Sequence, residues 1–305
     1  SSAKISRDYF LIFSLLMMLF LYGIYLLLQR MLDKNYKYYS LIILLPSILY
    51  FSFNRYDVLP AFLSILSLYL LYIKKYNLSS FLLALGVLSK WYLIILFPIY
   101  FLYCCNIEKR LNYNMLIIFV VTGIVGILPT FFISGLDGFL VPYKFHMSRG
   151  YNKESLFYII KAFFNGIFSI NIGFKPVYFA FFLLQFSAVL LLLLFKVDSF
   201  EKVVKLSAVF ILVFMLFAKF YSPQWILWVF PFLILLINSQ RDIIILLLFD
   251  LSTYIYFPVF WDLSSIFPIK VLFFSLIVIK SIFLIYYIMK IIKELNVESI
   301  AALES

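Results

Sequence analysis

Three cations lie beside long apolar runs. The solvated surface of a soluble protein would not explain their positions. Lys90 interrupts the stretch "GVLSKWYL", Arg149 belongs to "FHMSRGYNKES", and Lys219 precedes the Ser-Pro break of "AKFYSPQWILW". Ionisable side chains near hydrocarbon are costly, and by default they mark a pathway or a site. Cationic side chains bind phosphate through charge-assisted hydrogen bonds and stabilise negative charge on a departing group. We therefore take Lys90, Arg149 and Lys219 as candidate ligands of a phosphate.

A carboxylate and several polar residues accompany these cations. Asp57 can be the N-cap of a helix beginning at Val58, or it can be a catalytic base, and the sequence leaves both roles open. The stretch "YKFHMSRGYNKES" suits a phosphate or pyrophosphate headgroup, although a solvated basic loop against lipid headgroups has the same composition. A lone histidine is more often a structural residue than a ligand. The remaining pocket candidates are Arg55, His146, Glu154 and Gln224.

The composition of the chain requires most of it to lie in lipid. Of its 305 residues, 66% are hydrophobic and 13% are charged, whereas soluble domains are about half apolar and about a quarter charged. The net charge of +11 would suit nucleic acid in a soluble protein, but these cations mostly occupy short turns between apolar runs. We predict an all-α, polytopic membrane protein with a single transmembrane domain over residues 1–305. Its partner is the lipid bilayer and not nucleic acid.

About eleven apolar runs separate the polar segments. A hydrocarbon core of about 30 Å needs about 20 helical residues, so the shorter runs predict tilted or sunken helices. The sequence therefore predicts a helical bundle with about eleven crossings. The runs are 9–28, 39–53, 58–73, 78–89, 91–103, 114–134, 174–195, 203–217, 223–238, 241–257 and 268–290.

The cations also predict an orientation for this bundle. If the first run crosses from outside to inside, every inner turn carries Lys or Arg. This scheme requires residues 156–172 to form an interfacial or re-entrant segment, which the Gly and Pro residues of "NGIFSINIGFKP" allow. It also places the N-terminus outside, and a further span upstream of residue 1 is the simplest explanation of that position.

In this orientation the polar residues at membrane depth gather on the external face. Lys90 lies between two runs of about a dozen residues, which rise only about 18 Å each as helices. A hairpin that turns at Lys90 would hold its ammonium below the membrane surface, in a cavity. The alternative is one long helix in which Lys90 snorkels or pairs with a carboxylate. The predicted external face comprises 54–57, 90, 135–172, 218–224 and 257–267.

Four stretches of the chain occur in a recognisable order and approximate spacing. They are "NRYDVLPAFLSILSLYLLY", "LLALGVLSKWYLIILFPIYFLY", "FHMSRGYNKES" and "AKFYSPQWILWVFPFL", within roughly residues 50–240. Together they resemble the membrane-embedded sugar transferases of the GT-C class, which use a polyprenyl-phosphate sugar donor. The similarity is to the polyprenyl-phosphate mannosyltransferases of bacteria and archaea and to the first mannosyltransferase of glycosylphosphatidylinositol assembly.

The resemblance implies a GT-C-like bundle that transfers a sugar, with mannose expected, from a polyprenyl- or dolichyl-phosphate donor. The acceptor would be a hydroxyl of a glycan, lipid or protein on the external or luminal face. The membrane would be the plasma membrane in a prokaryote or the endoplasmic reticulum membrane in a eukaryote. The resemblance also allows a divalent cation, although the residues themselves show no cofactor or metal site.

The chain departs from this class in one respect. The transferases carry an essential acidic residue or pair in a first external loop, and no such loop precedes residue 9 here. The catalytic base is therefore unassigned, and Asp57 does not take that role merely because it remains.

Two other functions fit the same residues. A lipid-linked sugar transporter also needs a polar cavity with basic headgroup contacts, but it should show an inward-opening polar route or broken helices in corresponding halves. A noncatalytic subunit of a membrane complex would be consistent with the absent acidic loop.

Overall fold

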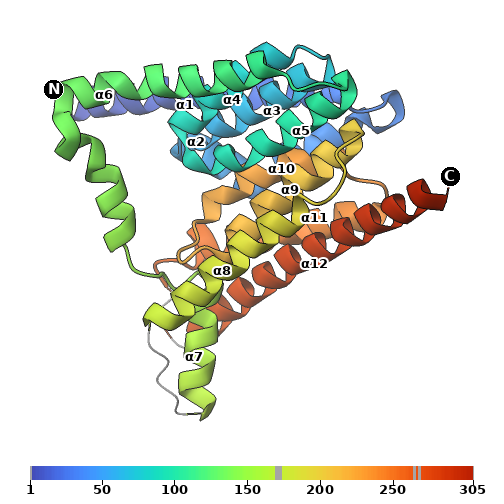
Figure 1. Cartoon of the computed structure of the whole chain (residues 1–305). Coiled ribbons are helices and arrows are strands. Elements are labelled where there is room, and N and C mark those ends of the chain that lie inside the picture. The colour runs from blue at the N-terminus through green and yellow to red at the C-terminus, as the bar shows by residue number, and fades with distance from the viewer. Residues whose placement is uncertain (1, 169–173, 264–265, 267–268, 305) are drawn as a thin grey trace.

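The computed structural model is all-α over the residues that it describes, which are 2–168, 174–263, 266 and 269–304. Many of its helices run side by side, with α6 and α12 on opposite flanks and α9 and α10 between them (Figure 1). The α-helices are α1 (Ser2–Met31), α2 (Pro46–Asn54), α3 (Val58–Tyr72), α4 (Tyr76–Ser89), α5 (Phe97–Glu108), α6 (Tyr113–Ser148), α7 (Leu156–Phe168), α8 (Phe174–Leu192), α9 (Phe200–Phe217), α10 (Ile226–Leu235), α11 (Gln240–Tyr254) and α12 (Ile269–Glu304). Shorter helical turns are η1 (Lys34–Leu44), η2 (Trp91–Leu96), η3 (Pro223–Trp225) and η4 (Ile255–Val259).

The predicted apolar runs fall on these helices, but not all of the helices are long. Within the described residues, five helical segments are long and apolar enough to cross a membrane, and shorter apolar helices have 10–17 residues. The fold class and the multi-pass character are therefore supported by the structure, whereas eleven crossings stay a prediction. The five candidate spans are Arg7–Met31, Trp91–Glu108, Tyr113–Ser148, Gln240–Val259 and Val271–Glu298.

A kink at Gly135 divides α6 into two limbs. The backbone angles there, φ 63° and ψ −173°, favour glycine because a side chain would be strained at this positive φ. Figure 1 shows the first limb running along the bundle and the second limb turning sharply at its end. The first limb matches the predicted run 114–134. The second limb is helical as far as Ser148, so much of the expected loop at 143–155 continues this helix.

The chain folds back at Lys90, as the hairpin prediction requires. Helix α4 ends at Ser89, and Lys90 has an extended backbone with φ −160° and ψ 123°. A Cβ added to Gly86 would lie 2.6 Å from Leu93 Cδ1, so the segments on the two sides of the turn are in close contact. The hairpin is confirmed and the single long helix is wrong, but the pairing of Lys90 with a carboxylate, which was part of that alternative, does occur, with Asp57.

The predicted interfacial or re-entrant segment 156–172 begins as helix α7. This helix has 13 residues and is about 20 Å long, which is too short to cross a bilayer of about 30 Å. In Figure 1 it extends away from the lower part of the bundle. Residues 169–172 lie outside the described residues.

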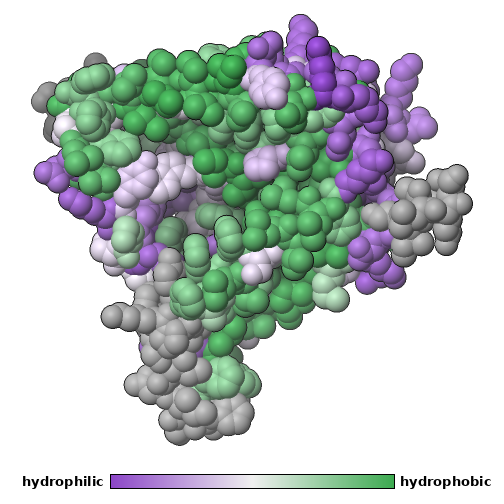
Figure 2. All heavy atoms as spheres, viewed as in Figure 1, coloured by the Kyte–Doolittle hydropathy of each residue, from purple (hydrophilic) through white to green (hydrophobic). Residues whose placement is uncertain are grey.

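Hydrophobic side chains cover the flanks of the bundle, and hydrophilic side chains gather toward its two ends (Figure 2). Ile133 is 84% exposed and Leu194 is 80% exposed, and apolar surface on this scale marks contact with lipid or another apolar partner. Helix α9 is buried on nearly every side, so it forms the centre of the core. The flanks therefore suit the bilayer, and the hydrophilic ends suit its two surfaces.

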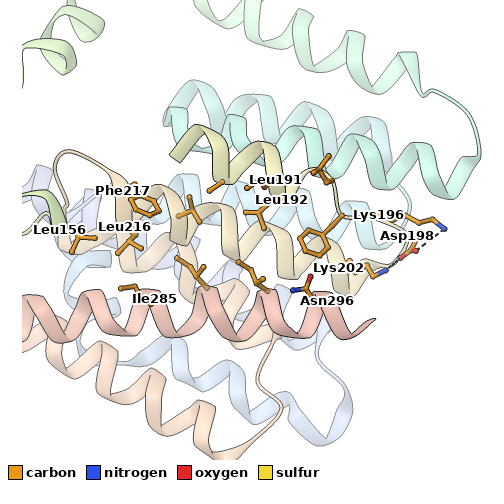
Figure 3. Close-up of a pocket in the computed structure, with 16 residues that line it drawn as sticks. Leu156, Leu191, Leu192, Lys196, Asp198, Lys202, Leu216, Phe217, Ile285 and Asn296 are labelled. Carbon is orange, nitrogen blue, oxygen red and sulfur yellow. Dashed lines mark hydrogen bonds and ion pairs between the residues drawn. The ribbon is translucent and has the colours of Figure 1, made fainter. Parts of the chain in front are cut away.

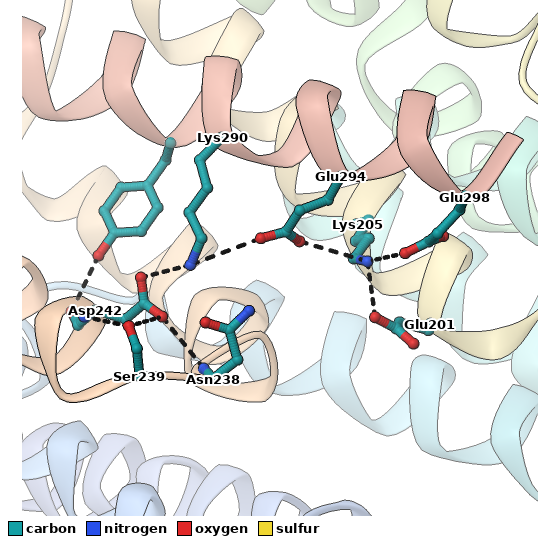
Figure 4. A network of polar contacts seen from close by, with 9 residues as sticks. Glu201, Lys205, Asn238, Ser239, Asp242, Lys290, Glu294 and Glu298 are labelled. Carbon is teal, nitrogen blue, oxygen red and sulfur yellow. Dashed lines mark hydrogen bonds and ion pairs between the residues drawn. The ribbon is translucent and has the colours of Figure 1, made fainter. Parts of the chain in front are cut away.

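An ion-pair network joins α9, α11 and α12 near the C-terminal end of α12 (Figure 4). Lys205 on α9 is 4% exposed, and it pairs with three carboxylates. Lys290 on α12 lies 2.5 Å from Asp242 on α11. The other acidic members are Glu201, Glu294 and Glu298. Lys205 and Lys290 thus connect three helices.

Candidate functional site

One cavity of about 740 Å³ collects polar groups from widely separated parts of the chain. We call it the polar cavity. Its walls come from the turn between α2 and α3, the turn at Lys90, the second limb of α6 with Arg149, and the segment from α9 to α10. Its polar and charged members are Asn54, Arg55, Asp57, Ser89, Lys90, His146, Arg149, Lys219, Ser222 and Gln224.

The structure brings most of the residues singled out in the sequence to this cavity. Glu154 is the exception and lies elsewhere. The described residues of segment 257–267 do not line the cavity either. The predicted site residues that do line it are Arg55, Asp57, Lys90, His146, Arg149, Lys219 and Gln224.

Asp57 lines the polar cavity, and its side chain is only 1% exposed. Its Oδ1 atom accepts a hydrogen bond from the Lys90 ammonium and another, 2.9 Å long, from Trp228 Nε1. Asp57 occupies the N-cap position of α3, but its side chain accepts no capping hydrogen bond. The predicted N-cap position is thus correct, but the side chain does not cap the helix, because the carboxylate is turned toward Lys90. Two donors, one from the turn after α4 and one from α10, hold it there.

Lys90 stands among aromatic rings and still reaches the polar cavity. Its Nζ atom lies 4.7 Å from the ring centre of Tyr56 and 5.0 Å from that of Trp228. Tyr92 stacks on Trp228 with 3.9 Å between ring centroids and fixes the indole. Cation–π attraction and the ion pair together hold the ammonium in one place. With 21% of its side chain exposed, Lys90 keeps a face open to a ligand.

Arg149 and Lys219 form a second cationic group in the same cavity. Lys219 Nζ donates hydrogen bonds to the carbonyl oxygens of His146 and Met147, at 2.6 Å and 3.2 Å, where α6 ends. The Arg149 guanidinium lies 4.2 Å from the ring centre of Phe220. Burial, and next the charge of Arg149, lower the pKa of Lys219. The two cations are close enough to repel each other, and a bound anion would reverse the sign of that interaction.

Asn152 ties the two loops that carry these cations. Its Nδ2 atom donates to the carbonyl oxygen of Tyr221 at 2.5 Å, and the Tyr221 N–H donates to Asn152 Oδ1 at 3.0 Å. This reciprocal pair joins the loop after Arg149 to the segment after Lys219. Asn152 was not predicted as a site residue, because a single amide in a polar loop gives no signal of its tertiary partner.

Glu154 lies behind the cavity wall instead of in it. Glu154 is 3% exposed, and its Oε1 atom is buried without a hydrogen-bond partner within the described chain. Asn152 donates to its other oxygen at 2.9 Å. Burial raises the pKa of Glu154 to about 7, against the opposing effects of the Lys280 and Arg149 charges. The structure therefore gives Glu154 a buried position, in contrast to the predicted pocket role.

Lys280 on α12 anchors the same loop. This residue is 1% exposed, and its Nζ atom donates to the carbonyl oxygen of Glu154 at 2.6 Å. The ammonium also lies 3.4 Å from the ring centre of Tyr221. The signal for Lys280 was present in the sequence, because it is the lysine nearest the middle of the run 268–290 and a charge at that depth needs a partner.

The donor groups of the polar cavity suit an anion and not a divalent cation. Hard divalent cations require several oxygen ligands, whereas Asp57 supplies the only carboxylate among the described lining residues. Lys90 and Trp228 already engage that carboxylate. Elsewhere in the described chain, no group of three or more His, Cys, Asp or Glu residues could hold a metal ion. The divalent cation that the family resemblance allows does not fit here.

No protein-family model matches this sequence, and a search of curated proteins finds no significant match. The likeness to GT-C transferases therefore depends on the four sequence stretches described above.

Proposed function

We propose that this chain binds a polyprenyl-phosphate sugar in the polar cavity and transfers the sugar to a hydroxyl acceptor. The supporting observation is that polar residues from all four of the GT-C-like stretches line one cavity. Its volume of about 740 Å³ lies within the range of small-molecule sites, about 300–1,000 Å³. Mannose is the proposed sugar, and the external or luminal face of the plasma or endoplasmic reticulum membrane is the proposed place of reaction.

Arg149 and Lys219 are the proposed ligands of the donor phosphate. A guanidinium donates two parallel hydrogen bonds to phosphate oxygens, and an ammonium adds a compact charge. The mutual repulsion of these cations becomes attraction toward a shared anion. Lys90, on another wall of the same cavity, is placed to contact the phosphate or the sugar next to it.

The proposed reaction exchanges one bond for another at the anomeric carbon. The acceptor oxygen forms a bond to this carbon as the bond from the carbon to the phosphate oxygen breaks. The phosphate departs with the bonding electrons, and preorganised cations stabilise the charge that develops on it. The proton of the acceptor hydroxyl passes to a carboxylate acting as general base.

Asp57 is better suited to holding Lys90 than to accepting this proton. Its carboxylate is nearly fully buried and is engaged by both Lys90 and Trp228. We therefore assign Asp57 a positioning role and leave the base unassigned. The same observation favours a second candidate function, in which this chain binds a lipid phosphate as a noncatalytic subunit and a partner supplies the carboxylate.

Binding and transfer can be measured separately in reconstituted vesicles. The full chain is incubated with radiolabelled polyprenyl-phosphate mannose, and bound donor and released polyprenyl phosphate are quantified with and without hydroxyl acceptors. Arg149→Ala is compared with Lys34→Ala, which removes an exposed cation that does not line the cavity. Binding with acceptor-dependent release supports the transferase, whereas binding without release supports the noncatalytic subunit. Absence of binding, or equal binding by Arg149→Ala, would overturn both.

A further inference from the structure

A second, larger cavity lies between α8, α9 and α12. Its volume is about 1,020 Å³, and it shares no lining residue with the polar cavity. Figure 3 shows its side chains projecting from all three helices along a common groove. Because most of these side chains are apolar and the flanks carry exposed apolar residues such as Leu191 and Leu194, the groove faces the same hydrocarbon as the rest of the surface.

The groove is apolar at one end and polar at the other. Leu156, Leu216 and Phe217 form the apolar end in Figure 3. Lys196, Asp198, Lys202 and Asn296 form the opposite end. A wholly apolar ligand would leave the polar end unused, and a wholly polar ligand would leave the apolar end unused. The lining therefore fits an amphiphile whose head lies beside Lys196.

The length of the groove fits a chain from one leaflet. Ile285 and Asn296 both line it from α12, and the eleven-residue step between them rises about 16 Å. Half of the hydrocarbon core is about 15 Å thick. A fatty acyl chain that begins at the polar end would therefore run along the groove to about the middle of the bilayer.

The polar end has an excess of positive charge. Lys202 is held 2.8 Å from Asp198 and is only 9% exposed. Lys196 lies 3.8 Å from the same carboxylate but is 75% exposed. Two cations share one carboxylate, so Lys196 can turn toward a phosphate without leaving Asp198 unpaired. Basic groups at the membrane end of such a groove favour an anionic lipid headgroup.

We propose that this groove binds a glycerophospholipid of the leaflet that Lys196 faces. One acyl chain fills the groove, and the phosphate lies against Lys196 and Asn296. This lipid is distinct from the proposed sugar donor, because its phosphate lies near the start of α9, whereas Lys219 and the polar cavity lie beyond the other end of that helix. The site is independent of the proposed sugar transfer.

Native mass spectrometry of the full chain, released from vesicles of phosphatidylglycerol and phosphatidylcholine, tests this site. Ala188→Phe fills the groove, and Leu190→Phe is its matched control because Leu190 is exposed on the same helix outside the groove. Lys196→Glu reverses the charge at the polar end, and Lys34→Glu is the matched control at an exposed position.

We expect the wild-type chain and both controls to retain one phospholipid per chain. Ala188→Phe should lose it, and Lys196→Glu should retain phosphatidylglycerol about thirtyfold less well, the factor for a change of two charges near an anionic headgroup. A wild-type chain without phospholipid, retention unchanged in Ala188→Phe, or a dimer that excludes lipid from this face would overturn the proposal. Polyprenyl phosphate in place of phospholipid would also overturn it.

Discussion

Replacing Lys90 with Met is expected to destabilise the fold by about 3 kcal/mol. The substitution keeps a long apolar stem and removes the ammonium that holds Asp57. Breaking a buried ion pair from one side costs about 3–5 kcal/mol, because the other charge stays buried without compensation. Asp57 is 1% exposed and Lys90 is 21% exposed. Partial solvation at the lysine end places the expected cost at the lower limit of that range.

Titration from mild detergent into SDS, followed by tryptophan fluorescence and circular dichroism, measures this loss. Asp57→Asn is the second variant, since an amide can still accept the hydrogen bond from Trp228 Nε1. The double variant, Lys90→Met with Asp57→Asn, should be less destabilised than the sum of the two single losses, because it leaves no unpaired charge. Lys34→Met controls for removing a lysine at an exposed position.

A loss of less than about 1 kcal/mol in the free energy of unfolding of Lys90→Met would be typical of exposed ion pairs, which contribute little to stability. Losses that add in the double variant would show that the two residues do not depend on each other. Either result would refute the conclusion that Asp57 and Lys90 form a buried pair that shapes the polar cavity.

Three further predictions concern the loops around the cavity. Arg149→Ala and Lys219→Ala should each weaken binding of labelled polyprenyl phosphate about tenfold, and together by less than the product, because the second loss acts on a phosphate already poorly held. Asn152→Ala should also weaken this binding, since it releases the loop of Arg149 from Tyr221. Thermal stability should fall as the pH rises from about 4.5 to about 7. Burial raises the pKa of Glu154 from 4.5 to about 7, so the folded state holds a proton there that the unfolded state has lost. Glu154→Gln should reduce this dependence.

Each of these predictions has a result that would contradict it. Multiplicative losses for Arg149 and Lys219 would separate the two cations into independent contacts. Normal affinity in Asn152→Ala, beside an unchanged Lys34→Ala control, would show that the loop needs no such tie. An identical pH profile in Glu154→Gln would assign the change in stability to another group.

The helices were largely predictable from the sequence, because a helix in a bilayer needs a continuous run of apolar residues and such a run can be read locally. The run 58–73 matches α3 at Val58–Tyr72, and the run 203–217 matches most of α9 at Phe200–Phe217. The second limb of α6 was not predicted, because Gly138 and Pro142 are local signals for a loop. Exposed apolar side chains such as Phe145 suit this limb to contact with hydrocarbon, where a helix must satisfy its own backbone hydrogen bonds, and this requirement outweighs those signals.

The polar cavity was predictable in its members but not in its contacts. Lys90 and Arg149 could be found because charge beside hydrocarbon is costly wherever it occurs. The pairing of Asp57 with Lys90 and Trp228 depends on how separate helices pack, and no local pattern reports it. In the sequence, Glu154 looks like the other polar residues of its loop. The reciprocal bonds of Asn152, however, turn that loop so that Glu154 is buried.

The most direct test of the central proposal is an experimental structure of the full chain with polyprenyl-phosphate mannose bound in a lipid nanodisc. The proposal predicts density for the phosphate in the polar cavity, within hydrogen-bond distance, about 2.7–3.2 Å, of both the Arg149 guanidinium and the Lys219 ammonium. Density for the donor phosphate beside Lys196 in the groove, or a polar cavity that stays empty at saturating donor, would contradict it.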